Sequence, residues 1–131
     1  LHHNHFDKFP HNRISGAGEL LIEDNIFSNC HAALLCFDLM KYWYESGRVK
    51  HLVYRNNILD NCDIVGNSAF LRIGVPGIAE ELTPKIHERI EITGNRFSRI
   101  ACRAIQASGV RDLILENNVF DTENEDIIVT Y

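Results

Sequence analysis

The chain has 131 residues, of which 45% are apolar and 24% are charged, and its formal net charge is -5 at neutral pH. This length and apolar content allow one domain with a buried core. The negative charge disfavours nucleic acid and polyanionic ligands and leaves neutral ligands as the simpler expectation. The sequence contains no run of about 18 apolar residues, so we expect no membrane span.

An asparagine recurs along the chain, each time followed two residues later by a large apolar residue. The five pairs are Asn4/Phe6, Asn25/Phe27, Asn57/Leu59, Asn95/Phe97 and Asn118/Phe120. Apolar residues at alternating positions precede the last four, which predicts short strands with one buried face. Asparagine suits a sharp corner because its side chain bonds nearby backbone groups and because it tolerates left-handed backbone.

Successive asparagines are separated by 21, 32, 38 and 23 residues, so the shorter copies approach the length of one solenoid coil. A second strand-like run follows each of the last four corners, at residues 31–37, 69–75, 102–108 and 126–131. The pattern predicts an all-β fold, a right-handed parallel β-helix of about five coils, in which Asn25, Asn57 and Asn95 form a hydrogen-bonded ladder. An antiparallel β-sandwich also has short strands, but it would not place asparagine at the same phase of each unit.

Residues 1–131 are thus predicted to form one β-helix segment, with loop insertions at about 38–48 and 76–88. A repeat copy is already under way between Leu1 and Phe6, and the last residues, 127–131, are mostly apolar. Solenoids need polar caps over their end coils, and neither end shows one. We therefore expect an internal segment, or a truncated copy, of a longer β-helix.

The cysteines and histidines do not form metal-ligand motifs. Cys30, Cys36, Cys62 and Cys102 include no C-x-x-C pair, so buried free thiols are favoured over a disulfide, with Cys30 and Cys62 stacked in one column. His2 and His3 are adjacent and would project to opposite faces of a strand. We therefore expect neither a metal site nor a cofactor. The scattered histidines are expected at the surface or at corners: His11, His31, His51 and His87.

The first insertion has an unusual composition for a loop. It contains the only tryptophan of the chain, Trp43, between Tyr42 and Tyr44, together with the carboxylates Asp38 and Glu45. Aromatic rings match the apolar face of a pyranose, and neighbouring carboxylates can bond its hydroxyls or act as acid and base. The combination fits a sugar site. In the alternative interpretation, Trp43 only packs the loop against the coil and Glu45 is solvated.

The second insertion carries Pro76 and Pro84, which stiffen it, and the adjacent acids Glu80 and Glu81. These two carboxylates could face the same groove as the first insertion, since long loops on one corner of a β-helix line a groove along the strands. A solvated loop tip is the alternative.

The string Tyr42-Trp43-Tyr44-Glu45-Ser46-Gly47-Arg48-Val49, followed by the strand that leads into Asn56-Asn57, resembles a segment of glycoside hydrolase family 110. These are bacterial exo-acting α-1,3-galactosidases built on a right-handed β-helix. Further similarity runs through residues 69–76, 87–97, 104–107 and 113–120, so the resemblance covers most of the chain but only the C-terminal part of the family's β-helix.

The resemblance implies an inverting hydrolysis of terminal α-galactose by two carboxylates. On this basis Asp38 and Glu45 are the candidate catalytic residues, with Trp43, Tyr42, Tyr44 and Arg13 as substrate-binding residues. It also implies a galactose-terminated oligosaccharide as partner, and a secreted, periplasmic or cell-surface location in a bacterium. The sequence does not indicate an oligomeric state.

The chain departs from the family pattern at two places. Asp38 stands alone where the family has a denser acidic cluster, and Gly77 follows Pro76 where an acid is expected. Either departure would fit an altered substrate or a degenerate, inactive copy.

Two other functions remain open. One is a non-catalytic carbohydrate-binding or structural β-helix. The other is a polysaccharide lyase, which would need a Ca²⁺ site of clustered carboxylates and a basic residue, and the coil strands show no stacked acidic column.

Overall fold

The computed structural model describes residues 1–13, 16–36, 49–64, 66, 69–74 and 87–130. Its described part consists of short strands and their connections, without a helix. The strands are β1 (His5–Asp7), β2 (His11–Arg13), β3 (Gly16–Glu23), β4 (Ile26–Ser28), β5 (Ala32–Cys36), β6 (Val49–Arg55), β7 (Ile58–Asp60), β8 (Ala69–Ile73), β9 (His87–Thr93), β10 (Arg96–Ser98), β11 (Arg103–Ala107), β12 (Val110–Glu116), β13 (Val119–Asp121) and β14 (Ile128–Thr130).

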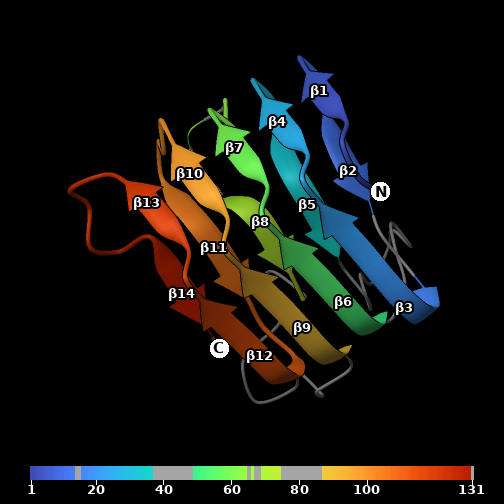
Figure 1. Cartoon of the computed structure of the whole chain (residues 1–131). Helices are drawn as coiled ribbons and strands as arrows, with labels where there is room; N and C mark the ends of the chain where they lie inside the picture. Colours follow the sequence, from blue (N-terminus) through green and yellow to red (C-terminus); the bar gives the residue numbers. More distant parts are fainter. Residues whose placement is uncertain (14–15, 37–48, 65, 67–68, 75–86, 131) are drawn as a thin grey trace, which may run out of the picture.

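The strands form three sheets, and every described strand pair is parallel (Figure 1). Sheet 1 has the order β1-β4-β7-β10-β13, sheet 2 the order β14-β11-β8-β5-β2, and sheet 3 the order β12-β9-β6-β3. Along the sequence the strands visit sheets 1, 2 and 3 in turn before returning to the next strand of sheet 1. The all-β, parallel, three-sheet arrangement is consistent with a β-helix.

Equivalent residues of successive repeats pair in register. In sheet 1, Phe27 pairs with Leu59, Leu59 with Phe97, and Phe97 with Phe120. Each repeat therefore places its large apolar residue at the same point, and Phe27, Leu59 and Phe97 are almost completely buried. Burying a side chain of this size contributes roughly 1.5–3 kcal/mol, so these aligned residues are a major stabilising feature.

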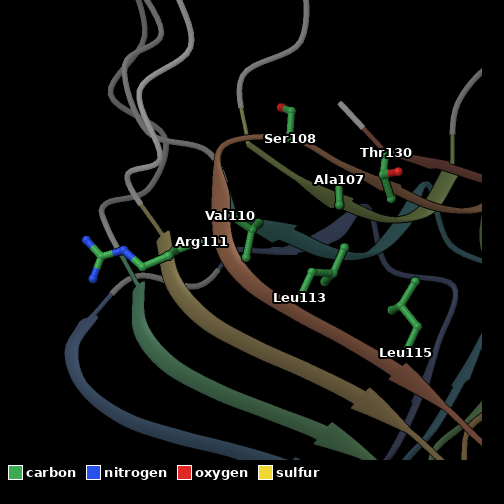
Figure 2. A pocket seen from close by; sticks show the side chains of 7 residues that line it. All are labelled: Ala107, Ser108, Val110, Arg111, Leu113, Leu115 and Thr130. Atoms are coloured by element: carbon green, nitrogen blue, oxygen red, sulfur yellow. The ribbon is translucent and has the colours of Figure 1, made fainter.

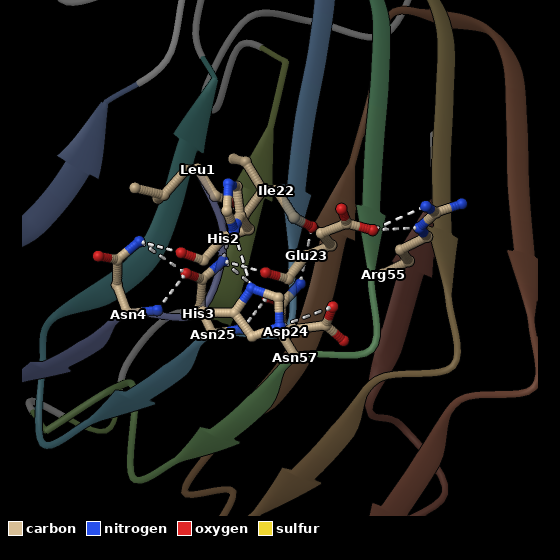
Figure 3. Close-up of polar contacts among 10 residues, drawn as sticks. All are labelled: Leu1, His2, His3, Asn4, Ile22, Glu23, Asp24, Asn25, Arg55 and Asn57. Atoms are coloured by element: carbon tan, nitrogen blue, oxygen red, sulfur yellow. Dashed lines mark hydrogen bonds and ion pairs between the residues drawn. The ribbon is translucent and has the colours of Figure 1, made fainter.

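The predicted asparagine ladder is present. The backbone N–H and the Nδ2–H of Asn25 both donate to Oδ1 of Asn57, at 2.9 and 3.1 Å, and Asn4 donates to Oδ1 of Asn25 in the same way (Figure 3). The ladder continues through Asn95 to Asn118 with the same pattern. Asn25, Asn57 and Asn95 are 1% exposed or less, so the ladder satisfies buried polar groups that would otherwise lack partners.

The left-handed backbone lies one residue before the ladder position, which corrects the sequence-based assignment of that role to the repeated asparagine. The residues with positive φ immediately before the five ladder positions are His3, Asp24, Asn56, Gly94 and Asn117. Asparagine, aspartate and glycine tolerate this conformation best, which explains their use at this corner. The ladder residue itself contributes its side-chain hydrogen bonds.

Aromatic rings stack between neighbouring repeats in the core. Phe97 and Phe120 lie with ring centroids 5.0 Å apart, and Phe6 and Phe27 with centroids 5.3 Å apart. Tyr54 packs beside Phe27 at 6.0 Å and is completely buried. Its hydroxyl has no hydrogen-bond partner in the described part of the chain, and burial raises its pKa well above the ordinary value.

The four cysteines are free thiols, as predicted. Cys30 and Cys62 lie at equivalent positions of neighbouring repeats and are completely buried. A hydrogen bond between their side chains and the loss of solvent both raise the pKa of the Cys62 thiol. The Cys62 thiol is therefore protonated, and both side chains are shielded from solvent, so they are suited to packing rather than to nucleophilic chemistry.

Candidate functional site

The segments that carry the two predicted insertions connect neighbouring strands of sheet 2 to neighbouring strands of sheet 3. The first lies between Cys36, the last residue of β5, and Val49, the first residue of β6. The second lies between β8, which ends at Ile73, and β9, which begins at His87. Cys36 and Ile73 are register partners, and β6 pairs with β9, so both segments connect sheet 2 to sheet 3 at the same corner.

Five of the six predicted site residues fall outside the described residues. Asp38, Tyr42, Trp43, Tyr44 and Glu45 all belong to the segment between Cys36 and Val49, and their roles stay predictions.

The sixth, Arg13, is the last residue of β2, and its backbone pairs with Leu35, next to Cys36. The structure thus brings the backbone of Arg13 to the corner from which the first segment departs.

Beneath this corner lies a buried histidine. His87 is completely buried, so of the two positions expected for it, surface or corner, the surface is wrong. Its Nδ1 accepts a hydrogen bond from the backbone N–H of Val49 at 3.2 Å, and Sγ of Cys36 lies 3.8 Å from the same nitrogen. The backbone N–H of His87 donates to the carbonyl oxygen of Gly109. One signal of this burial was available: His87 occupies an inward position, where the paired residue of the next repeat is Val110.

The second segment departs beyond a glycine with little space around it. Gly74 has φ of +97°, and a Cβ added there would overlap the hydroxyl and carbonyl oxygens of Ser108. Its backbone N–H donates to the carbonyl oxygen of Cys36, and the N–H of Ser108 donates to the carbonyl oxygen of Ile73. These bonds tie three neighbouring repeats together at the corner.

A charged cluster lies on sheet 3. Oε1 of Glu91 accepts hydrogen bonds from Nε of Arg89 at 2.6 Å and from Nε2 of His51 at 3.3 Å, and Nδ1 of His51 lies 3.8 Å from Glu19. The hydrogen bond from Arg89 lowers the pKa of Glu91, and His51 adds to this effect against the partial burial of the carboxyl. Glu91 is therefore a poor proton donor near neutral pH, and the cluster is suited to cross-strand pairing rather than to general acid catalysis.

Further ion pairs lie close to the asparagine corners. Arg55 pairs with Glu23 across β6 and β3, and Nε2 of His3 lies 3.7 Å from Asp24 (Figure 3). Arg99 pairs with Asp60, and the resulting hydrogen bond lowers the pKa of that carboxyl. In the part of the chain that the structure describes, no group of three or more histidine, cysteine or acidic residues is arranged to hold a metal ion.

One hollow of about 510 Å³ opens between β12 and the ends of β11 and β14 (Figure 2). It is lined by Ala107, Ser108, Val110, Arg111, Leu113, Leu115 and Thr130. Leu113 and Leu115 occupy the inward positions that Ile90 and Ile92 fill in the preceding repeat, so the hollow exposes core side chains at the edge of sheets 2 and 3. None of the described residues that line it is acidic, so it is not a candidate catalytic site.

Comparison with known proteins shows which class of enzyme the chain is similar to. The chain is 32% identical over 116 residues to the alpha-1,3-galactosidase A of Shewanella woodyi, a match that covers 85% of this chain and 19% of that relative. It is 41% identical over 44 residues to the alpha-1,3-galactosidase B of Bacteroides thetaiotaomicron, covering 34% of this chain and 7% of the relative. No family model and no solved structure matches the chain.

The chain is therefore a homologue of part of the α-1,3-galactosidases, and its resemblance to glycoside hydrolase family 110 is confirmed. It spans about a fifth of the length of the longer-matching relative. Among the residues that the structure describes, there is no helix long and apolar enough to cross a membrane.

Proposed function

We propose that the chain is part of a glycoside hydrolase that removes terminal α-linked galactose. The similarity to two α-1,3-galactosidases is the observation that carries this proposal. In it, residues 1–131 form one right-handed parallel β-helix segment of about five coils, with insertions at about 38–48 and 76–88 that border a substrate groove. The departure of both segments from one corner supports this arrangement.

The proposed reaction uses Asp38 and Glu45 as its two carboxyl groups. One, protonated, donates a proton to the leaving glycosidic oxygen, while the other accepts a proton from a water that attacks the anomeric carbon from the opposite face. The C–O bond to the leaving group breaks as the bond to the water oxygen forms, so the configuration at the anomeric carbon inverts. Such a mechanism requires the two carboxyl groups roughly 6.5–9.5 Å apart, to leave room for the water.

Substrate binding is proposed to rest on Trp43, with Tyr42 and Tyr44 beside it and Arg13 as a hydroxyl ligand. An aromatic face stacks on the C–H groups of a pyranose, and a guanidinium can donate two hydrogen bonds to neighbouring hydroxyls. The position of Arg13 in β2, paired with Leu35 beside Cys36, supports its inclusion. The proposed partner is a glycan ending in galactose.

The mechanism requires neither metal nor cofactor, because proton transfer and water attack are carried out by carboxyl groups. The proposed location is outside the cytoplasm of a bacterium, as a secreted, periplasmic or cell-surface protein. The bacterial origin of both relatives supports only the bacterial part of that proposal.

The proposal is tested by hydrolysis of a nitrophenyl α-galactoside by the full-length protein. Asp38→Asn and Glu45→Gln should each lower kcat by about 10²–10⁴, since each removes a proton-transferring group. Glu125→Gln, at an exposed position, is the matched control and should leave kcat unchanged.

The other candidate functions predict different results. Galactose binding without turnover would favour a non-catalytic carbohydrate-binding segment. Chelator-sensitive release of unsaturated uronates would favour a lyase. Full activity of both carboxylate variants would contradict the assignment of Asp38 and Glu45.

A further inference from the structure

The buried imidazole of His87 occupies a position where an apolar side chain would be the simpler solution. Its register partner in the next repeat is Val110, and Val49 and Cys36, which contact its ring, both belong to the hydrophobic core cluster. Burying a polar ring costs free energy unless its nitrogens are hydrogen-bonded. His87 is completely buried, and the hydrogen bond that Nδ1 accepts from Val49 offsets part of that cost.

These contacts involve both flanks of the first segment. Cys36 is the last described residue before the segment and Val49 is the first described residue after it. The N–H of Val49 donates to Nδ1 of His87, and the Cys36 thiol lies within reach of the same nitrogen. Nδ1 of His87 thus contacts both the residue before the segment and the residue after it.

The direction of the Val49 hydrogen bond defines the state of the ring. A backbone N–H can only donate, so Nδ1 must carry a lone pair, and in the neutral imidazole the proton then resides on Nε2. A proton on Nδ1 would oppose the N–H of Val49. The geometry therefore specifies the Nε2–H form of His87.

His87 also begins β9, the strand that follows the second segment. Its backbone N–H bonds the carbonyl oxygen of Gly109, which joins β11 to β12. The side chain of His87 therefore contacts the residues on either side of the first segment. Its backbone forms a hydrogen bond at the point where the chain enters β9 after the second segment. His87 is the described residue that links the two.

We propose that His87 is a positioning residue that fixes Cys36 and Val49, and through them the placement of the proposed catalytic carboxyls between them. This inference rests on the proposed function, because it assigns His87 an effect on Asp38 and Glu45 rather than contact with substrate. A misplacement of about 1 Å at a catalytic group can lower the rate about 100-fold. The effect should therefore fall on kcat more than on KM.

The test compares His87→Val, His87→Asn and the control Ile90→Val in the full-length protein. Valine matches the neighbouring repeat but cannot accept a hydrogen bond, whereas the asparagine amide oxygen can reach the region of Nδ1. Ile90 is buried in the same strand and belongs to the core cluster that contains Cys36 and Val49, but its side chain is purely apolar. Each variant is measured by amide hydrogen exchange and by hydrolysis of a nitrophenyl α-galactoside.

His87→Val should raise the exchange rate of the Val49 amide by about 100-fold and lower kcat by about 10- to 100-fold, with KM changed less than about threefold. His87→Asn should recover most of both losses. Ile90→Val should leave both within about threefold of wild type. Exchange at Leu52 should stay unchanged in all three.

Failure of this inference is distinguishable from failure of the proposed function. If the wild-type protein does not hydrolyse the galactoside, the proposed function fails, and the Val49 exchange rate still tests the anchoring. Unchanged Val49 exchange in His87→Val would overturn the anchoring, and faster exchange with unchanged kcat would overturn the positioning role. If the variants do not fold, ¹H–¹⁵N correlation of the wild-type ring decides: a proton on Nε2 is expected, and a proton on Nδ1 would overturn the inference.

Discussion

Asn57 donates both its backbone N–H and its side-chain Nδ2–H to one oxygen, Oδ1 of Asn95, at 2.9 and 3.1 Å. The same Nδ2 also donates to the carbonyl oxygen of Ile22 at 3.0 Å. Because Asn57 in turn accepts from Asn25, one amide joins three repeats inside the core. The ladder therefore fixes the register of the corners.

Replacement of Asn57 by alanine should lower the free energy of unfolding by about 2–4 kcal/mol. The variant leaves the Asn25 donors and the Ile22 carbonyl without their buried partner, and each such loss costs about 1–3 kcal/mol before relaxation. Urea unfolding measures the change. Asn4→Ala, at the exposed start of the ladder, is the control and should cost less than half as much; equal losses would contradict the burial argument.

Replacement of Gly74 by alanine should destabilise the protein by about 3 kcal/mol or more. The new Cβ would overlap backbone and side-chain oxygens of Ser108, and φ of +97° is unfavourable for any side chain. Thermal unfolding of Gly74→Ala and Gly18→Ala provides the comparison, since a Cβ at Gly18 would meet nothing within 4 Å. A Gly74→Ala protein as stable as wild type would show that this corner adopts another conformation.

Replacement of Tyr54 by phenylalanine should leave the stability unchanged or raise it by up to about 1 kcal/mol. The hydroxyl is buried without a partner in the described structure, so its removal relieves a desolvation cost while the ring keeps its contact with Phe27. Tyr54→Ala should instead cost about 3–5 kcal/mol, because it also removes the ring. A loss above about 1 kcal/mol in Tyr54→Phe would show that the hydroxyl forms a hydrogen bond.

The Arg99–Asp60 pair should contribute to the free energy of unfolding only at pH values at which the Asp60 carboxyl is ionised. The hydrogen bond from Arg99 lowers the pKa of Asp60 below its ordinary 3.8, with Ser98 adding to the effect. The contribution is therefore present above that value and is lost as the pH falls through the lowered pKa.

Arg99→Gln should therefore lower the free energy of unfolding slightly near pH 7, because the pair is solvent-exposed and screened, and should change it even less near pH 2. Urea unfolding at both pH values checks this, with the exposed Arg111→Gln as control. A larger cost at the acidic pH would reverse the predicted sign.

The sequence repeat predicted the parts of the fold that recur. Because Asn25, Asn57 and Asn95 stand at one phase of an alternating apolar pattern, their stacking and the parallel pairing of Phe27 with Leu59 follow from spacing alone. Features that occur in only one repeat could not be predicted in this way. The burial of His87 could not be predicted from a lone histidine, since its partners Cys36 and Val49 are brought to it only by the parallel pairing of neighbouring repeats.

The charged cluster on sheet 3 was missed for a similar reason. His51 and Glu91 each precede an inward residue of their strand, so the alternation already placed both on the outer face. The pairing of the two, and the addition of Arg89, depend on the register between β6 and β9. That register could have been obtained by aligning the repeats on their asparagines.

The most direct test of the central claim is the anomeric configuration of galactose released from an α-galactoside by the full-length protein. In ¹H NMR recorded during hydrolysis, the account predicts that β-galactose appears first and that the α anomer follows only by mutarotation, because water attacks opposite the leaving group. Initial release of α-galactose would contradict the proposed inverting pair Asp38 and Glu45, and the absence of any galactose release would contradict the enzymatic assignment itself.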